Sequence, residues 1–423
     1  MHPTHGRRWA LAGVLLVLTV LVATTATAGS AKPAAATGTL EVFSWWTGGG
    51  EAAGLTKVIG IWKAENPGST FENAAVAGGA GTNAKAVLAQ RLAAKDPPDS
   101  FQGHAGAELQ DYIKAGQLES LNFLYKQQGF AKVMPKQLLS QITYKGQIYS
   151  VPVNIHRANV LWYSPVVLKN AGVTKVPATW PQFMSALKKV KDKGLIPLAV
   201  GEQWTQKHLF ETVLLATVGP ARYTALWKKG ANWKNPGVTL AINRFKTVLT
   251  YTNSDAASLT WQDASKLVVN HQAAFNIMGD WANGYFTELK KKPKIDYGWG
   301  TVPGTGKTYQ WLSDSFTLPK GANNRPAAIE WLKLLGSKRA QDAFNPVKGS
   351  IPARKDADPK LYNEYLKSAL QSWKTHTLVG SLTHGVVANN KWNSEIDGAL
   401  GLFLQDKNVA KFQQKLVSAA GNA

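Results

Sequence analysis

The sequence predicts an α/β fold built on a largely parallel sheet. Segments with strand-like and helix-like hydrophobic patterns follow one another in the order β-α-β-α-β between residues 40 and 102. A hydrophobic content of 44% and a charged content of 17% fit a globular protein with a large core. The length of 423 residues allows two or three domains.

The first elements can be justified one by one. Residues 40–44 alternate as a strand does, and residues 51–65 place Leu55, Val58 and Trp62 on one helical face. An Asn-Pro-Gly sequence ends this helix. The β-α-β-α-β order is completed by a strand over 70–76, a helix over 83–94 and a strand that begins at 100.

The rest of the chain continues to alternate. A Lys-Gly turn predicts a hairpin over 144–149, and apolar runs predict strands over 158–163 and 273–278. Amphipathic patterns predict helices over 180–193, 206–217, 238–252, 262–271, 325–335, 361–371 and 409–420.

The first 28 residues predict a cleaved signal peptide. Arg7 and Arg8 precede an apolar stretch over 10–23, and an Ala-Thr-Ala sequence at 26–28 suits a signal peptidase. An uncleaved anchor is the alternative, and export by the general or the twin-arginine route stays open. Residues 29–38 predict a flexible leader.

The sequence contains no cysteine. Disulfides, thiol catalysis, cysteine metal sites and a lipid-modified N-terminal cysteine are therefore excluded. With the signal peptide, this predicts a periplasmic protein that is not a lipoprotein, with full secretion as the second possibility.

The chain is strongly basic, with a formal net charge of +22. Removal of residues 1–28 takes away two arginines and no acidic residue, which leaves +20. A basic surface can attract nucleic acid, but here the basic residues are scattered singly and in twos and threes. We therefore expect no nucleic-acid partner.

A tryptophan pair, Trp45 and Trp46, ends the first predicted strand and is followed by a Gly-rich turn and Glu51. An α/β fold binds ligands at the carboxyl ends of its strands. Flat apolar faces beside a carboxylate suit a sugar ring, which has CH faces and hydroxyl edges. At a strand end one indole can pack inside while the other lines a cleft.

Signals for catalysis or metal binding are weak. The mature histidines show no paired metal-ligand spacing on a helix, and no Gly-x-Ser-x-Gly elbow occurs. The glycines at 78–81 can approach a ligand oxygen, whereas the segment 304–308 fails the spacing of a phosphate-binding loop. A glycosidase carboxylate pair stays open at this point, because its separation is set by tertiary structure. We expect no catalytic residues, no metal and no cofactor.

Seven segments in order resemble the glucose/mannose-binding proteins of bacterial ABC importers. The resemblance covers essentially the whole mature chain and rests on residues 43–51, 78–81, 152–156, 278–282, 313–316, 344–351 and 380–385. It implies a two-lobed, periplasmic-binding-protein-like fold of type II, each lobe having a mostly parallel sheet with flanking helices.

The resemblance also implies a set of substrate-binding residues. Stacking faces are expected from tryptophans, with Trp46 carrying more of the contact than Trp45, and hydrogen bonds from polar side chains. The full set is Trp45, Trp46, Glu51, Gln102, His104, Trp281, Asp314, Lys348 and His384. Trp204 is a weaker candidate for the cleft wall.

The expected function follows from the resemblance. The N-terminal lobe would comprise 39–153 and 309–346, and the C-terminal lobe 154–308 and 347–423, with crossing strands near 153–156, 307–312 and 347–350. A monomer would capture a monosaccharide, glucose above mannose or a related hexose, and deliver it to an ABC transporter permease. The alternatives are a binding protein for a disaccharide or oligosaccharide and a secreted carbohydrate-active enzyme.

Overall fold

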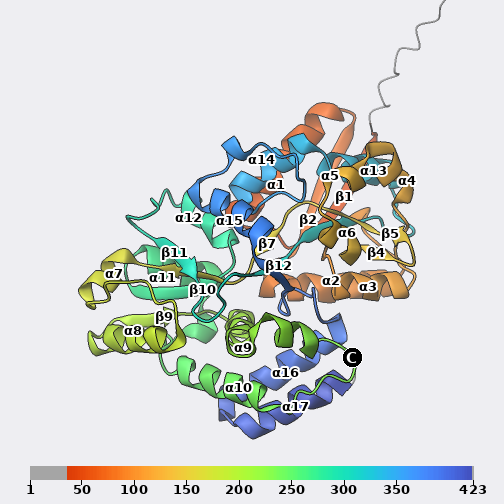
Figure 1. Ribbon diagram of the computed structural model, residues 1–423. Coiled ribbons are helices and arrows are strands. Elements are labelled where there is room, and N and C mark those ends of the chain that lie inside the picture. The colour runs from red at the N-terminus through yellow and green to blue at the C-terminus, as the bar shows by residue number, and fades with distance from the viewer. Residues whose placement is uncertain (1–35, 422–423) are drawn as a thin grey trace, which may run out of the picture. The chain divides into compact units, whose positions relative to one another are not determined.

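We analysed a computed structural model, which describes residues 36–421 (Figure 1). The predicted signal peptide and most of the predicted leader lie outside the described residues. Between residues 36 and 421 no helix has the length and apolar character needed to cross a membrane.

The first sheet has five strands in the order β2-β1-β3-β13-β6. Strand β1 runs parallel to β2 and β3, whereas β13 runs antiparallel to β3 and β6. The register of β13 on β3 places Asp314 opposite His104 and Phe316 opposite Gln102. The strands are β1 Gly38–Ser44, β2 Ser69–Ala75, β3 Ser100–His104, β6 Ser150–Pro152 and β13 Asp314–Thr317.

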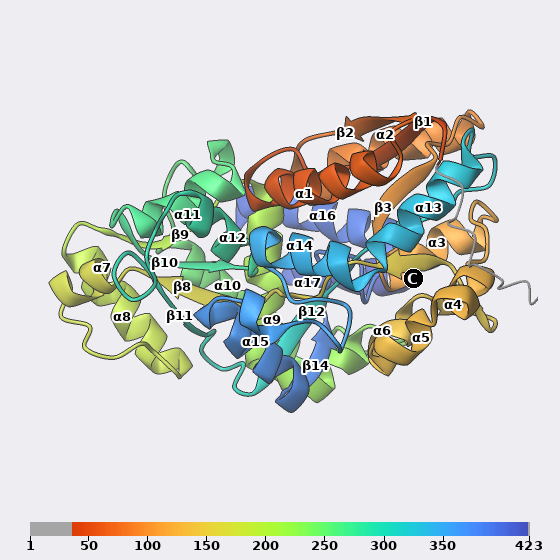
Figure 2. The same cartoon turned by 90° about the horizontal axis from the view of Figure 1, so that it is seen from above.

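Helices pack around this sheet because each has one apolar face. In α1, Leu55, Val58 and Trp62 are buried, and the Trp62 ring lies 6.0 Å from that of Trp331 in α13. Figure 2 shows α1 and α14 side by side, and the two helices are in close contact. The helices are α1 Gly49–Glu65, α2 Thr82–Ala93, α3 Ala107–Lys114, α4 Asn122–Gln128, α5 Phe130–Val133, α6 Lys136–Gln141, α13 Arg325–Leu335 and α14 Lys338–Lys348, with the short 3₁₀ helix η1 Gly79–Gly81 and the hairpin β4 Thr143–Tyr144 and β5 Gln147–Ile148.

A second sheet has the order β11-β8-β10-β9. Its central strand β10 is buried along its whole length and is antiparallel to β8 but parallel to β9. The strands are β8 Val160–Tyr163, β9 Ile196–Ala199, β10 Ala273–Met278 and β11 Gly298–Thr301. The accompanying helices are α7 Pro165–Asn170, α8 Trp180–Asp192, α9 Gln203–Leu226, α10 Pro236–Leu249, α11 Trp261–Val269 and α12 Trp281–Glu288, with the 3₁₀ helix η2 Ala256–Ser258.

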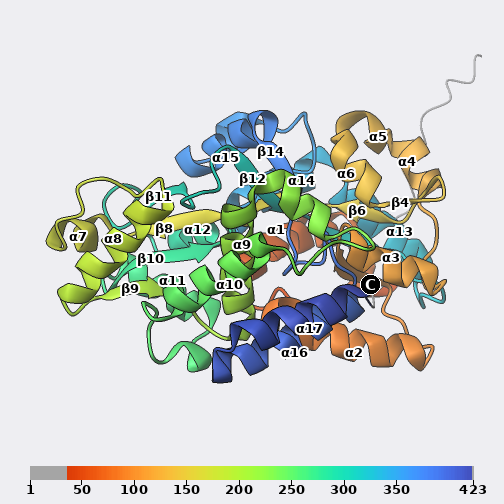
Figure 3. The same cartoon turned by 60° about the horizontal axis from the view of Figure 1, so that its bottom comes forward.

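A third, three-stranded sheet has the order β14-β12-β7. It brings two of the predicted crossing segments together, because β7 pairs with β12. Just before β7, Ile155 exchanges two backbone hydrogen bonds with Ile351. Figure 3 shows α16 and α17 packed side by side, close to α10. The elements are β7 His156–Arg157, β12 Thr308–Leu312, β14 Thr377–Gly380, α15 Glu364–Thr375, α16 Asn390–Asp406 and α17 Val409–Gly421, with the 3₁₀ helix η3 Pro359–Leu361.

The structure confirms the predicted α/β class and most predicted elements to within a few residues. It differs in that each of the three sheets is mixed, not mostly parallel. Antiparallel neighbours need no crossover helix, so strands such as β13 can join a sheet on their return through the chain. Helices α3 to α7, α12, α14 and α16 were not predicted. The proposed lobe boundaries stay a prediction.

Candidate functional site

A cavity of about 270 Å³ gathers seven of the nine predicted site residues. Its walls come from the carboxyl end of β1, the end of β3, the start of β13 and the starts of α9, α11 and α12. The lining residues are Trp45, Thr47, Glu51, Ala77, Gly78, Gly79, Gly81, His104, His156, Glu202, Trp204, Thr260, Trp261, Gln262, Trp281, Leu312, Asp314, Lys348 and His384.

Trp45 presents its ring to the cavity from the end of β1. Its backbone N–H donates to Gln102, and its ring lies 5.0 Å from the His104 ring. Gly81 packs against the same indole and has a φ of 91°. A Cβ atom on Gly81 would lie 2.7 Å from the Trp45 ring, so the glycine is needed for this close packing.

Trp46 lies outside the cavity lining, although the resemblance implies that it carries more of the ligand contact than Trp45. Only 1% of Trp46 is exposed, and its ring packs against Phe316 and Phe344 at centroid distances of 5.5 and 4.9 Å. Adjacent residues point to opposite sides of an extended chain, so one indole enters the core and the other the cavity. The structure assigns these places in the reverse of the predicted order.

Gln102 is also outside the lining, where it positions two residues that do line the cavity. Its side-chain oxygen accepts from Trp45, and its side-chain nitrogen donates to Asp314 at 2.8 Å. A buried amide with both ends engaged holds its neighbours in a fixed geometry. Gln102 therefore acts on the cavity through Trp45 and Asp314, and a direct ligand contact for it stays a prediction.

Asp314 is a cavity-lining carboxylate whose two oxygens both accept hydrogen bonds from neighbouring side chains. Gln102 donates to one oxygen and Asn154 to the other, at 2.8 and 2.7 Å. Burial alone would raise the pKa of Asp314, but the hydrogen bond from His156 and the charge of Lys348 outweigh it and hold this pKa well below its ordinary range. Asp314 is thus an ionised acceptor aimed at the cavity.

His104 is held by Glu108, which is itself paired with Lys85. The ring Nδ1 lies 2.9 Å from Glu108, and the Lys85 ammonium lies 2.7 Å from the same carboxylate oxygen. Burial would raise the pKa of Glu108, yet the charges of Lys85 and His104 lower it to about 2. A fixed carboxylate therefore orients the His104 ring.

Lys348 and Glu51 form an ion pair at the cavity wall, with 2.7 Å between the ammonium and one carboxylate oxygen. Lys348 is the last residue of α14 and Glu51 lies in the first turn of α1. Each position is favourable for the helix dipole, which attracts cations at the C-terminus and anions at the N-terminus. The pair can both donate to and accept from ligand hydroxyls.

Trp281 begins α12 and stands among other rings. Its centroid lies 5.1 Å from His384 and 6.3 and 6.5 Å from Trp204 and Trp261. Gly279 makes room for it, since a Cβ atom there would lie 2.1 Å from the Trp281 ring. This side of the cavity is therefore a wall of indoles.

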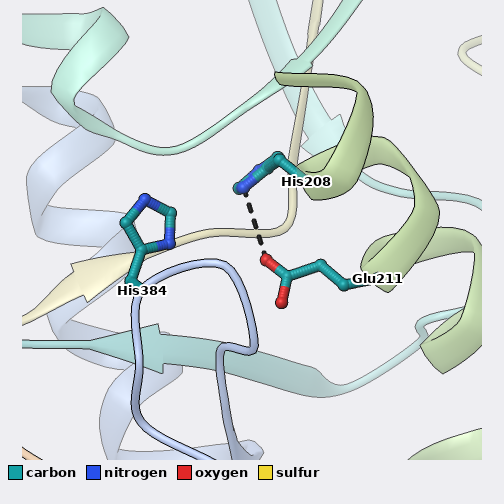
Figure 4. A group of neighbouring side chains, drawn as sticks. All are labelled: His208, Glu211 and His384. Atoms are coloured by element: carbon teal, nitrogen blue, oxygen red, sulfur yellow. Dashed lines mark ion pairs between the residues drawn. The ribbon is translucent and has the colours of Figure 1, made fainter. Parts of the chain in front are cut away.

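His384 connects the cavity to a buried polar group in α9. Its Nδ1 lies 2.9 Å from the Ser381 hydroxyl, which in turn lies 2.9 Å from a Glu211 oxygen. Figure 4 shows Glu211, His208 and His384 converging, with one ring nitrogen of His384 directed toward Glu211 and the other directed away. The three side chains offer ligand atoms within 4.8 Å of one another, although no metal-ligand spacing was found in the sequence.

Several lining residues were missed from the sequence. Thr260, Trp261 and Gln262 start α11, and the available signal was the Thr-x-x-Asp capping box, confirmed by the structure, that places them at a helix N-terminus. His156, within one of the recognised segments, lines the cavity and bonds Asp280 through Nδ1. Trp204, the weaker candidate, is part of the wall.

Comparison with known proteins identifies the family. The profile of the bacterial extracellular solute-binding proteins matches residues 36–342. The chain belongs to this family. It is a solute-binding protein of the exterior of the cell and not an enzyme.

Relatives and solved structures agree with this assignment. An uncharacterized ABC transporter extracellular-binding protein of Pyrococcus horikoshii is 33% identical, covering 90% of this chain and 87% of the relative. A "probable sugar-binding periplasmic protein" of Rhizobium meliloti is 32% identical, covering 84% and 87%. A bacterial solute receptor described as preferring β-D-galactopyranose shares the fold, with a TM-score of 0.78 at 20% identity over 91% of this chain and 98% of its own.

Proposed function

We propose that this protein captures a monosaccharide, with glucose the expected hexose, and delivers it to the permease of an ABC importer. It acts as a monomer in the periplasm after its signal peptide is removed, without a lipid anchor. The observation that carries the proposal is the cavity itself, which is lined both by indoles and by ionised and hydrogen-bonding groups.

The cavity chemistry matches a sugar. Trp45 and Trp281 supply apolar faces for the CH groups of a pyranose ring. Asp314 and the pair Glu51 and Lys348 supply charged partners for hydroxyls, which make stronger hydrogen bonds than neutral partners do. No part of this set requires the ligand to carry a charge.

The cavity size favours a small ligand. Its volume of about 270 Å³ lies just below the range of roughly 300–1,000 Å³ for ligand pockets. A chain of several sugar units would have to extend beyond these walls. The names of relatives support a sugar, and the name of the Pyrococcus protein supports an ABC transporter as partner.

Delivery requires that ligand binding alters the protein. Residues from the first sheet, such as Asp314, and residues from α12, such as Trp281, line the same cavity. A sugar that contacts both groups favours the arrangement in which they face each other. Hinge motion at the paired strands β7 and β12 is the expected route, and the closed form is expected to bind the permease.

Calorimetry with purified protein tests the proposal. The panel is glucose, mannose, galactose, xylose and maltose, and we expect the tightest binding for a hexose. Binding of maltose without any monosaccharide would support the oligosaccharide alternative. If no sugar in the panel binds, the proposed function is contradicted.

A further inference from the structure

The loop that carries His384 is tied to a single buried carboxylate. Glu211 of α9 accepts hydrogen bonds from the backbone N–H groups of Leu382 and Thr383, at 2.5 and 3.1 Å. It also accepts from the Ser381 hydroxyl, which lies 2.9 Å from Oε1 and 3.2 Å from Oε2. Glu211, Ser381 and His384 are all buried, so these bonds are shielded from water.

The hydrogen atoms of this group can be assigned by counting. Ser381 has one hydroxyl hydrogen, which can point to a Glu211 oxygen or to the His384 Nδ1; the remaining neighbour, the backbone N–H of His384, can only donate to the Ser381 oxygen. An ionised carboxylate can only accept, so the hydroxyl hydrogen points to Glu211. The Ser381 oxygen must then accept from Nδ1–H of His384.

The assignment holds wherever Glu211 is ionised. The Nε2–H of His208 donates to the carbonyl of Ala158, which leaves the His208 Nδ1 as a bare lone pair 3.4 Å from Glu211 Oε1. A neutral Glu211 whose proton is on Oε1 and directed at that nitrogen keeps the same assignment, because Oε2 still accepts from Ser381 at 3.2 Å. Burial raises the pKa of Glu211 to about 7, so both states occur near neutrality.

We propose that Glu211, acting through Ser381, fixes His384 in the tautomer with hydrogen on Nδ1, so that Nε2 faces the sugar cavity only as a hydrogen-bond acceptor. Glu211 and Ser381 are thus positioning residues. The inference rests on the proposed function in one respect, because it says which group of the sugar His384 binds. That group is a hydroxyl that donates a hydrogen bond to Nε2.

The surroundings of His384 support an acceptor. The ring lines the cavity, and its Nε2 has no hydrogen-bond partner among residues 36–421. Burial and the neighbouring His104 lower the pKa of His384 well below its ordinary value, so the ring is neutral and only one nitrogen carries hydrogen. A sugar fluorinated at the matching position cannot donate and should bind more weakly.

The tautomer can be read directly by nitrogen-15 NMR of histidine-labelled protein without ligand. The His384 signals are assigned by their loss in His384→Gln. We expect a protonated Nδ1 and a bare Nε2 in the wild type, and the Nε2–H form gaining population in Ser381→Ala. Ser315→Ala, which removes a buried hydroxyl bonded to the Gly103 carbonyl, is the matched control and should leave the His384 signals unchanged.

Two results would overturn the inference. One is an Nε2–H tautomer in the wild type, or a tautomer that Ser381→Ala does not change. The other is one equivalent of zinc in the purified protein, because a metal on His208, Glu211 and His384 would replace the Nδ1 hydrogen. These measurements need no sugar, so their failure is distinct from failure of the sugar panel.

A ligand experiment tests the consequence. Ser381→Ala should weaken binding of the preferred sugar about five- to tenfold, as expected for loss of one oriented hydrogen bond. The penalty for the fluorinated sugar should shrink in the same variant. An equal penalty in wild type and variant would show that His384 is not oriented by Ser381.

Discussion

Two histidines of the cavity lining pack edge to face, and each is held by a glutamate in a different way. The rings of His104 and His384 lie 5.5 Å apart at an angle of 82°. His104 bonds Glu108 directly, whereas His384 reaches Glu211 through Ser381. Both carboxylates are fully buried, yet the pKa of Glu108 is lowered to about 2 and that of Glu211 is raised to about 7.

The difference comes from a cation. Lys85 forms an ion pair with Glu108 at 2.7 Å, whereas the close partners of Glu211 are neutral N–H and hydroxyl donors and the bare Nδ1 of His208. Burial penalises the charged form of either glutamate, and only at Glu108 do the charges and hydrogen bonds of Lys85 and His104 reverse the balance. Two equally buried glutamates therefore differ in protonation: Glu108 stays ionised, whereas Glu211 holds its proton up to a pH of about 7.

The largest expected effect on sugar binding comes from removal of the Trp281 ring, which contacts His384. Trp281→Ala should weaken sugar binding by about 2–4 kcal/mol through lost stacking and burial. Calorimetry checks this, with Trp180→Ala, a half-buried indole of α8 outside the cavity lining, as the control. Unchanged affinity in Trp281→Ala would show that the ring serves only the core.

Glu108 should stabilise the fold above its unfolded pKa and lose this effect in acid. The difference between about 2 and the ordinary 4.5 corresponds to about 3 kcal/mol at roughly 1.36 kcal/mol per pKa unit. Urea unfolding of the wild type and Glu108→Gln should therefore show a wild-type advantage that shrinks as the pH falls from 4.5 toward 2. An advantage constant over this range would contradict the assignment.

Glu211 should behave with the opposite sign. Its folded-state pKa of about 7 lies above the ordinary 4.5, so its contribution is present below pH 4.5 and is lost as the pH rises through 7. Relative to Glu211→Gln, which mimics the neutral acid, the wild type should lose about 3 kcal/mol of unfolding free energy over that range. The same urea titrations measure it, and a loss toward acid instead would refute the contrast between the two glutamates.

Removal of the cation tests the cause directly. Lys85→Met should cost about 2 kcal/mol of unfolding free energy at pH 7, less than the roughly 3–5 kcal/mol for a fully buried pair because 21% of the Lys85 side chain is exposed. Lys188→Met, which breaks an exposed pair with Asp192, is the control and should cost much less than Lys85→Met. Equal costs in the two variants would remove Lys85 as the reason for the difference.

The sequence by itself determined the α/β class, about half of the helices and strands among residues 36–421, and seven of the residues that line the cavity. Local information suffices there, because hydrophobic periodicity marks helices and strands and strand ends mark ligand sites. Trp281, Asp314 and His384 could be named because each lies in a recognisable short segment. The adjacent tryptophans show the limit, since their alternation was predictable but the face each one takes was not.

Only the tertiary structure decided which indole enters the cavity and which carboxylate keeps a proton. Glu108 and Glu211 each lie near a histidine in sequence, at four and three residues, and nothing local separates them. Lys85 reaches Glu108 from another helix, and Ser381 reaches Glu211 from a loop far along the chain. Protonation in a buried site depends on these long-range neighbours, because the energy of a charge is set by what surrounds it in space.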